Sequence, residues 1–86
     1  MNNKHKATLQ KIFEKPPRPD VNWKDIEKLL IALGAIVKER EGSRIGVFLN
    51  GRVAIFHRPH PQKETDKGAL VSVRKFLENA EVKHDL

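Results

Sequence analysis

The chain has 86 residues, of which 38% are hydrophobic, and its 17 Lys and Arg against 11 Asp and Glu give a net charge of +6. This length allows one domain with one compact core, and the absence of cysteine excludes disulfides, thiolate metal sites and a thiol nucleophile. No apolar run approaches the roughly 20 residues that a membrane span needs, so we expect no membrane partner, and the lack of disulfides fits a cytoplasmic location.

We predict that residues 1–20 form a leader, which docks on a main domain of residues 21–86. Within the leader, Lys4 to Glu14 can form a short helix whose apolar stripe includes Leu9 and Ile12. Three prolines follow this segment, and they are expected to stop the helix and keep the chain extended.

The main domain is predicted to open with a helix that Asn22 caps at its start and Gly34 ends. Trp23 falls in the first turn, where we expect it to cover the helix end rather than to stack on a nucleic-acid base. Glu27 is expected to face water. The apolar positions recur at helical spacing and form a core stripe of Ile26, Leu29, Leu30 and Leu33.

From residue 35 the pattern changes to that of three antiparallel strands. We predict strands over residues 35–41, 44–49 and 52–57, joined by turns at Gly42-Ser43 and Asn50-Gly51. An Asn-Gly pair between alternating apolar positions is a strong signal for a two-residue hairpin turn.

The rest of the chain predicts a loop over residues 58–66, which contains two prolines, and a helix over residues 67–79 that Asp66 caps. The apolar stripe of this helix consists of Ala69, Leu70, Val73, Phe76 and Leu77. The order helix, three strands, helix predicts an α+β fold. Both helices should pack on one face of a three-stranded antiparallel sheet, because each has only one apolar stripe.

The Asn50-Gly51 turn also sets the register of the hairpin. Counting back from the turn pairs Arg44 with His57 across the two strands. Successive side chains of a strand point to opposite faces of the sheet, so one set faces the helices and the other lies on an open face. The inward set is Ile45, Val47, Leu49, Ala54 and Phe56, and the open set is Arg44, Gly46, Phe48, Val53, Ile55 and His57. Apolar side chains on the open face predict a partner surface.

The positive charge makes nucleic acid the first partner to consider, because Lys and Arg release counterions from polyanions. The same charge would also keep a small protein in solution or attract an acidic partner protein. Composition leaves these three alternatives open.

Several short motifs, taken in order, resemble the HicA toxins, which are small ribonucleases of bacterial type II toxin–antitoxin systems. They are Gly42-Ser43 at the first strand turn, Pro59-His60-Pro61 in the loop, and Lys67-Gly68 at the start of the last helix. The resemblance covers roughly residues 22–82. It implies a double-stranded-RNA-binding-domain-like fold, activity as an mRNA interferase with mRNA as substrate, and inhibition by a HicB-type antitoxin.

The family's usual motif at the first turn is Gly-Ser-His, with the histidine as the catalytic residue, whereas this chain has Arg44 at that position. A guanidinium does not exchange protons near neutral pH, so this role does not pass to Arg44. Three alternatives follow: His57 is catalytic, His60 is catalytic, or the protein binds RNA or its antitoxin without cutting. We rank His57 first because the register places it across the strand from Arg44.

RNA cleavage without a metal needs a base for the 2′-hydroxyl proton, an acid for the leaving 5′-oxygen and a cation for the phosphorane. His57 and His60 can exchange protons, and Arg44 and Arg58 can supply the cation. Ser43 would orient a phosphate or is an ordinary turn residue. The candidate RNA-binding residues are Ser43, Arg44, Arg58, Lys63 and Lys67.

The two histidines also suggest a metal site. His57 and His60 lie three residues apart on a segment broken by proline, with only Glu64 and Asp66 nearby as further ligands. This is a weak ligand pattern, so we expect neither a metal nor a cofactor.

Overall fold

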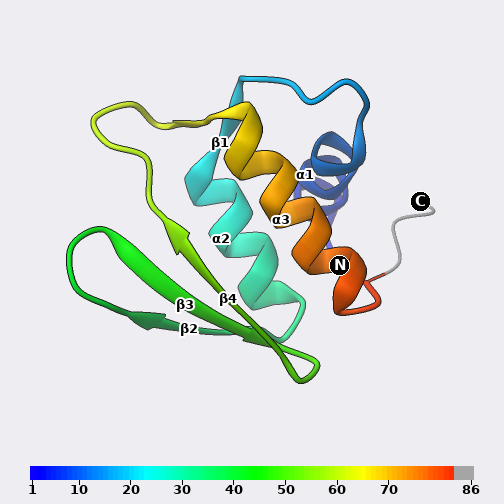
Figure 1. Cartoon of the computed structure of the whole chain (residues 1–86). Helices are drawn as coiled ribbons and strands as arrows, with labels where there is room; N and C mark the ends of the chain where they lie inside the picture. Colours follow the sequence, from blue (N-terminus) through cyan, green and yellow to red (C-terminus); the bar gives the residue numbers. More distant parts are fainter. Residues whose placement is uncertain (83–86) are drawn as a thin grey trace.

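A computed structural model of the chain describes residues 1–82, and within them it shows an α+β fold (Figure 1). The elements in chain order are α1 (Asn3–Phe13), β1 (Val21–Asn22), α2 (Trp23–Ala32), β2 (Ile36–Glu39), β3 (Arg44–Leu49), β4 (Arg52–His57), β5 (Glu64–Thr65) and α3 (Lys67–Asn79). The main sheet is antiparallel in the order β2-β3-β4, and β1 pairs with β5 in a second, two-stranded sheet.

Figure 1 shows α2 and α3 side by side on one face of the main sheet, with α1 on the far side of these two helices. The predicted fold class is therefore confirmed: an α+β fold of double-stranded-RNA-binding-domain-like order, preceded by a short helix. None of the helices within residues 1–82 is both long and apolar enough to cross a membrane.

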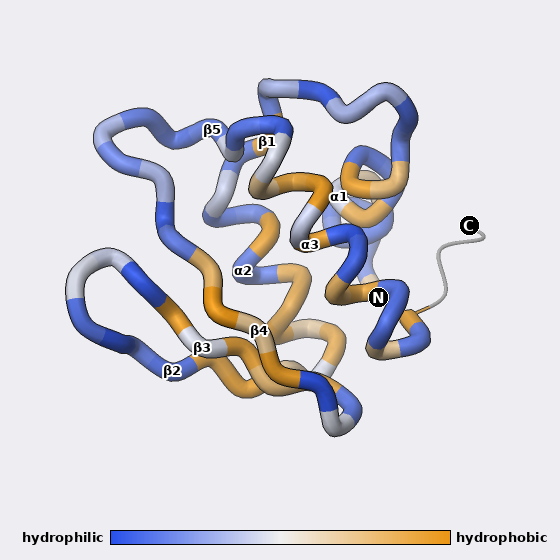
Figure 2. Tube along the Cα trace, viewed as in Figure 1, coloured by the Kyte–Doolittle hydropathy of each residue, from blue (hydrophilic) through white to orange (hydrophobic). Residues whose placement is uncertain are grey.

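The core lies where α2, α3 and the sheet meet, and Figure 2 shows hydrophobic residues of all three gathered there. The predicted helical stripes are confirmed, with Leu33 and Ala69 half-buried at their margins. The fully buried members are Ile26, Leu29, Leu30, Leu70, Val73 and Leu77, joined from the sheet by Ile45 and Val47. Burying each such side chain stabilises the folded state by about 1.5–3 kcal/mol.

The ends of α2 follow the predicted capping residues. The Asn22 side chain accepts a hydrogen bond from the Lys24 backbone N–H at 2.9 Å. At the other end Gly34 adopts φ +98°, and Ala35 N–H donates back to the Leu30 carbonyl at 2.9 Å. A left-handed residue at this position lets the last carbonyls of a helix find donors, and glycine adopts it without a Cβ penalty.

The end of α3 uses the same geometry without a glycine. Glu81 adopts φ +61°, its N–H donates to the Glu78 carbonyl at 3.0 Å, and the Val82 N–H donates to the Leu77 carbonyl at 3.0 Å. The left-handed conformation brings Cβ of an ordinary residue close to the backbone, so Glu81 holds this turn at a conformational cost.

Replacing Glu81 with glycine is therefore expected to raise the free energy of unfolding by about 0.5–1 kcal/mol, because the relief of Cβ strain exceeds the added backbone entropy of the unfolded chain. Urea denaturation measures the change. The matched control is Lys75→Gly at an exposed interior position of the same helix, which should lose about 1 kcal/mol. Equal destabilisation by both substitutions would contradict the argument.

The hairpin register is confirmed in full, from Leu49 opposite Arg52 to Arg44 opposite His57. Asn50 and Gly51 have φ +50° and +79°, as a turn of type I′ requires. The inward set of side chains packs against the helices as predicted.

The open face of the sheet carries exposed apolar side chains as predicted, but Phe48 is partly covered. Val53 and Ile55 are 59% and 44% exposed, in agreement with the prediction. Phe48, in contrast, is half-buried, and the Lys38 Nζ lies 5.9 Å from the centre of its ring. The long side chains of β2 and the segment after it therefore cover part of this face.

Two details differ from the sequence-based expectation. The first strand is shorter than predicted, Ile36–Glu39 rather than residues 35–41. The predicted loop over residues 58–66 contains β5, which pairs with β1 so that Val21 faces Thr65. These two residues are 2% and 1% exposed. A two-residue strand is too short to produce a period-2 pattern, so this pairing left no signal in the sequence.

Helix α1 is part of the packed structure. Leu9 and Ile12 are 0% and 1% exposed, and α1 contacts both α2 and α3. The expected docking of the leader is thus observed. Its separation at residue 20 from a domain of residues 21–86 stays a prediction, and the end of that range lies outside the described residues.

Candidate functional site

The site begins with the pair Arg44 and His57 at the open end of the hairpin. Arg58 N–H donates to the Ser43 carbonyl at 2.8 Å, one step beyond this pair. A hydrogen bond in that position makes Arg44 and His57 a non-hydrogen-bonded pair, the kind whose side chains approach most closely, with Cβ atoms about 4.5–5.5 Å apart. Both side chains are exposed. A guanidinium and an imidazole are therefore presented together to solvent.

Arg44 is anchored to its own turn. Its Nε donates to the Glu41 carbonyl at 3.2 Å, which leaves both Nη groups available for a phosphate. Ser43 adjoins it in the turn and is also exposed. These two candidate residues therefore adjoin each other at the open end of the hairpin.

His57 and His60 line one cleft of about 250 Å³, together with the start of α3. This places the two histidines of the predicted chemistry on a shared space. The Asp66 carboxylate also borders the cleft, where it accepts a hydrogen bond from the Ala69 N–H at 2.7 Å and so caps α3 as predicted. Lys67 follows as the first, exposed residue of that helix.

Arg58 points to the other side of the sheet end and is held by two carboxylates. Its Nε and Nη2 donate to Glu27 at 3.0 and 2.9 Å, and its Nη1 and Nη2 donate to Glu39 at 2.6 and 2.7 Å. Glu27 belongs to α2 and Glu39 to β2, so one side chain joins three parts of the fold. The expectation that Glu27 faces water is wrong: its side chain is only 17% exposed.

These contacts keep Arg58 positively charged and Glu39 negatively charged. The hydrogen bonds that Arg58 donates to Glu27 and Glu39 raise the pKa of its guanidinium, so it stays charged. The hydrogen bond from Arg58 holds the pKa of Glu39 below its ordinary value of 4.5. A cation that already faces two carboxylates has little attraction left for a phosphate. The role of Arg58 as an RNA ligand stays a prediction. Its framework role, which is to join α2 and β2 to the loop after β4, is shown by these hydrogen bonds.

Replacing Arg58 with methionine is expected to lower the free energy of unfolding by about 1–3 kcal/mol at pH 7, because it leaves the largely buried Glu27 carboxylate without a partner. Chemical denaturation measures the loss. Arg18 supplies a matched control, since it also bridges two carboxylates, Glu14 and Asp20, that are 49% and 59% exposed. Arg18→Met should cost clearly less than Arg58→Met, because solvent screens this exposed pair. Equal costs would contradict the framework role.

The loss of stability caused by Arg58→Met should depend on pH. A carboxyl whose pKa is lowered by folding adds stability above its unfolded pKa, and this stability is lost as the pH falls through the folded value. For Glu39 the loss begins below about pH 4.5. The stability difference between the wild type and Arg58→Met should therefore shrink as the pH is lowered past that point.

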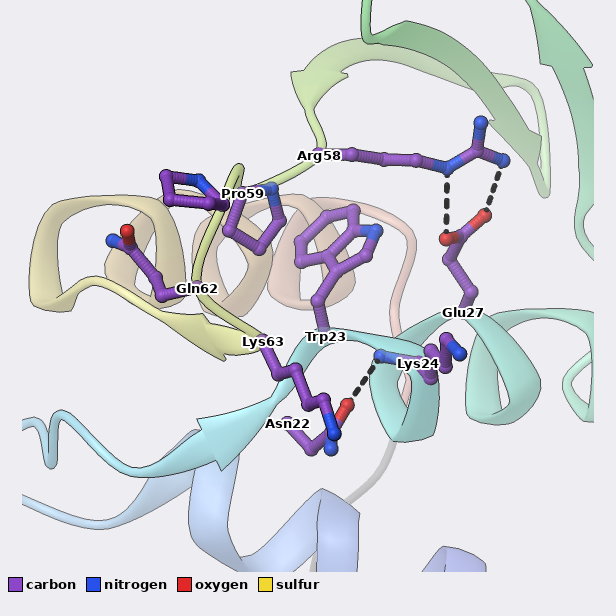
Figure 3. Close-up of a pocket in the computed structure, with 9 residues that line it drawn as sticks. Asn22, Trp23, Lys24, Glu27, Arg58, Pro59, Gln62 and Lys63 are labelled. Atoms are coloured by element: carbon purple, nitrogen blue, oxygen red, sulfur yellow. Dashed lines mark hydrogen bonds and ion pairs between the residues drawn. The ribbon is translucent and has the colours of Figure 1, made fainter.

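A second pocket, also of about 250 Å³, lies on the helix side of the same loop. Figure 3 shows Trp23 at its centre, between Lys63 and the ion pair of Arg58 with Glu27. Trp23 is 3% exposed and meets Phe56 edge to face at 6.0 Å, so the expectation that it covers the helix end is confirmed. Lys63 thus borders a different space from the histidine cleft.

The structure therefore divides the predicted site residues into groups. It places Arg44 opposite His57, and it places His57 and His60 on one cleft. Lys63 borders only the second pocket, whereas Arg58 borders both spaces. Sequence reasoning missed Glu27 and Glu39 as partners of Arg58. Their separations along the chain, 31 and 19 residues, follow no local rule that could have revealed them. Among residues 1–82, no three His, Asp or Glu side chains converge as they would to hold a metal ion.

Residues 23–82 match the family model of the HicA toxin of bacterial toxin–antitoxin systems, which covers well over half of the chain and leaves α1 outside it. Neither a curated protein nor a solved structure matches the chain.

Proposed function

Because the chain belongs to the HicA toxin family, we propose that it is the toxin of a toxin–antitoxin pair and acts as a metal-independent endoribonuclease on mRNA. The observation that carries this proposal is the Arg44–His57 pair, which presents a proton-transfer group beside a cation at the family's motif turn. His60, in the cleft that His57 also lines, supplies a second such group.

In this mechanism the RNA 2′-oxygen attacks the adjacent phosphorus while His57 takes the hydroxyl proton. The bond from phosphorus to the 5′-oxygen breaks, and His60 gives that oxygen a proton, which leaves a cyclic phosphate and a free 5′-hydroxyl. Arg44 faces the negative charge that builds on the phosphorane oxygens. Histidine suits both proton transfers because its ordinary pKa lies near neutral pH.

The proposed inhibitor is an acidic, HicB-type antitoxin. The net charge of +6 favours an acidic partner, and the exposed Val53 and Ile55 on the open sheet face offer it apolar contacts. Arg44 and His57 lie on the same face of the sheet. A partner seated there would cover the proposed chemistry and block access of RNA.

A second candidate function follows from Arg44 itself. The position holds a histidine in the family's usual motif, so this chain would be an RNA-binding or antitoxin-binding module that no longer cuts. Arg44→His distinguishes the two: in the binding module it should create cleavage where the wild type shows none. If His57 already acts as the base, the same change should give no large gain. RNA cleavage by purified protein measures the outcome.

The experiment that tests the proposal is induced expression of the wild type and of His57→Ala without antitoxin, followed by growth and mRNA integrity. The endoribonuclease predicts growth arrest with mRNA decay for the wild type, and neither for the variant at equal protein level. Absence of arrest from well-expressed wild type would reject cleavage and favour the binding module.

A further inference from the structure

We propose that the pocket beside Trp23 is a nucleobase subsite, which takes the base of an RNA nucleotide next to the phosphate held in the histidine cleft. This proposal rests on the proposed function, since it requires RNA to be the polymer in that cleft. It assigns a role to Gln62 and Lys63 that the chemistry of the histidines does not use.

The walls of the pocket suit a flat, mainly apolar ring with polar edges. Pro59 and Pro61 supply apolar surface, and the Trp23 indole lies beside Pro59 (Figure 3). The Gln62 side chain offers both a donor and acceptors, as the edge of a nucleobase requires. A volume of about 250 Å³ suits one base rather than a larger ligand.

The charges around the pocket select an anionic polymer. The exposed Lys24 and Lys63 border it, and its one acidic wall residue, Glu27, is neutralised by Arg58 at 2.9 Å. A phosphate entering with the base therefore meets free ammonium groups and no free carboxylate. Among the described residues the Trp23 Nε1–H is buried without a hydrogen-bond partner, which is uncommon for an indole.

The position of the pocket connects it to the proposed chemistry. Arg58, Pro59 and Gln62 border both this pocket and the cleft of His57 and His60, so one stretch of loop separates the two spaces. A single RNA strand that crosses this loop places a phosphate on one side and a neighbouring base on the other.

Contacts at both ends fix the loop that borders the pocket. The Trp23 backbone N–H donates to the Lys63 carbonyl at 3.0 Å, and Asn22 pairs with Glu64 in the short β1–β5 sheet. The pair of Arg58 with Glu27 fixes the other end of the loop to α2. A preformed pocket avoids the entropy cost of ordering a loop on binding.

Trp23 allows a direct test, because it is the only tryptophan in the chain and gives one indole N–H signal in a ¹⁵N-labelled protein. The full chain is titrated with 2′-O-methyl trinucleotides of A, C, G or U, whose blocked 2′-oxygen prevents cleavage, and with an abasic trimer of the same phosphate number. We expect at least one base-bearing trimer to shift the indole signal, and to bind at least ~5-fold more tightly than the abasic trimer.

Variants separate base recognition from charge. Gln62→Ala should reduce the preference for base over abasic trimer, while its control Gln10→Ala on the exposed face of α1 should not. Lys63→Ala should weaken both trimers, whereas Lys75→Ala on the exposed face of α3 should affect neither by a comparable factor.

The possible failures are distinguishable. An indole signal that stays still while signals around His57 shift with RNA overturns the subsite and leaves the proposed function standing. Equal effects of the abasic and base-bearing trimers also overturn it, and so does a signal that responds only to an acidic peptide. A responsive indole signal in a protein that leaves unmodified RNA intact supports the subsite and rejects the endoribonuclease.

Discussion

Replacing His57 with alanine is expected to slow RNA cleavage by the purified protein by roughly 10²–10⁴-fold, because the removal of one positioned proton-transfer group costs about that much. In the proposed mechanism the imidazole, which the hairpin holds opposite Arg44, acts as the base beside the phosphate that Arg44 faces. Initial rates on a defined RNA, at equal protein concentration, measure the effect. His60→Ala should cause a loss in the same range if it supplies the acid.

The control is His5→Ala, which removes an imidazole from α1 and leaves the site untouched. It should keep the wild-type rate. A wild-type rate for His57→Ala, with loss only for His60→Ala, would move the base to the loop histidine. If His57→Ala and His60→Ala both cleave RNA at the wild-type rate, neither histidine is catalytic and the proposed mechanism is wrong.

The double substitution Leu9→Ala with Ile12→Ala is expected to leave most of the chain unfolded at 37 °C. Each side chain is fully buried against the helical layer, and each truncation to alanine costs about 2–5 kcal/mol. Their sum of roughly 4–10 kcal/mol is comparable to the whole stability of an 86-residue domain, roughly 4–13 kcal/mol. Circular dichroism during urea and thermal unfolding measures the loss.

Substitutions on the exposed face of α1 provide the control. Lys6→Ala with Lys11→Ala changes two exposed positions of the same helix and should alter the stability by less than about 1 kcal/mol. If the Leu9 and Ile12 variant unfolds cooperatively near the wild-type midpoint, α1 is a detachable appendage. That outcome would support the predicted division at residue 20.

The parts of the fold that could be predicted from the sequence depend on local rules. Asn22 and Asp66 cap their helices, since a short polar side chain reaches a nearby backbone N–H. Asn50 and Gly51 tolerate positive φ, which selects the turn and with it the register. Strand alternation then assigns the buried and open faces, and counting along the two strands is enough to bring Arg44 opposite His57.

The parts that could not be predicted depend on contacts between distant segments. The pairing of Val21 with Thr65 spans only two residues a strand, too few for a pattern. Phe48 is covered by a side chain from the neighbouring strand, and strand alternation carries no information about such cover.

The helices, the hairpin register and the meeting of His57 with Arg44 could be predicted from the sequence, because each follows from interactions within a few residues or from counting outward from one turn. The role of Arg58 depends on the packed fold, since α2 and β2 bring Glu27 and Glu39 to it from 31 and 19 residues away. The same packing closes the pocket at Trp23 beside the histidine cleft. Side-chain charge and spacing state what a residue can bind, but which partner it meets depends on how the helices and the sheet pack in three dimensions.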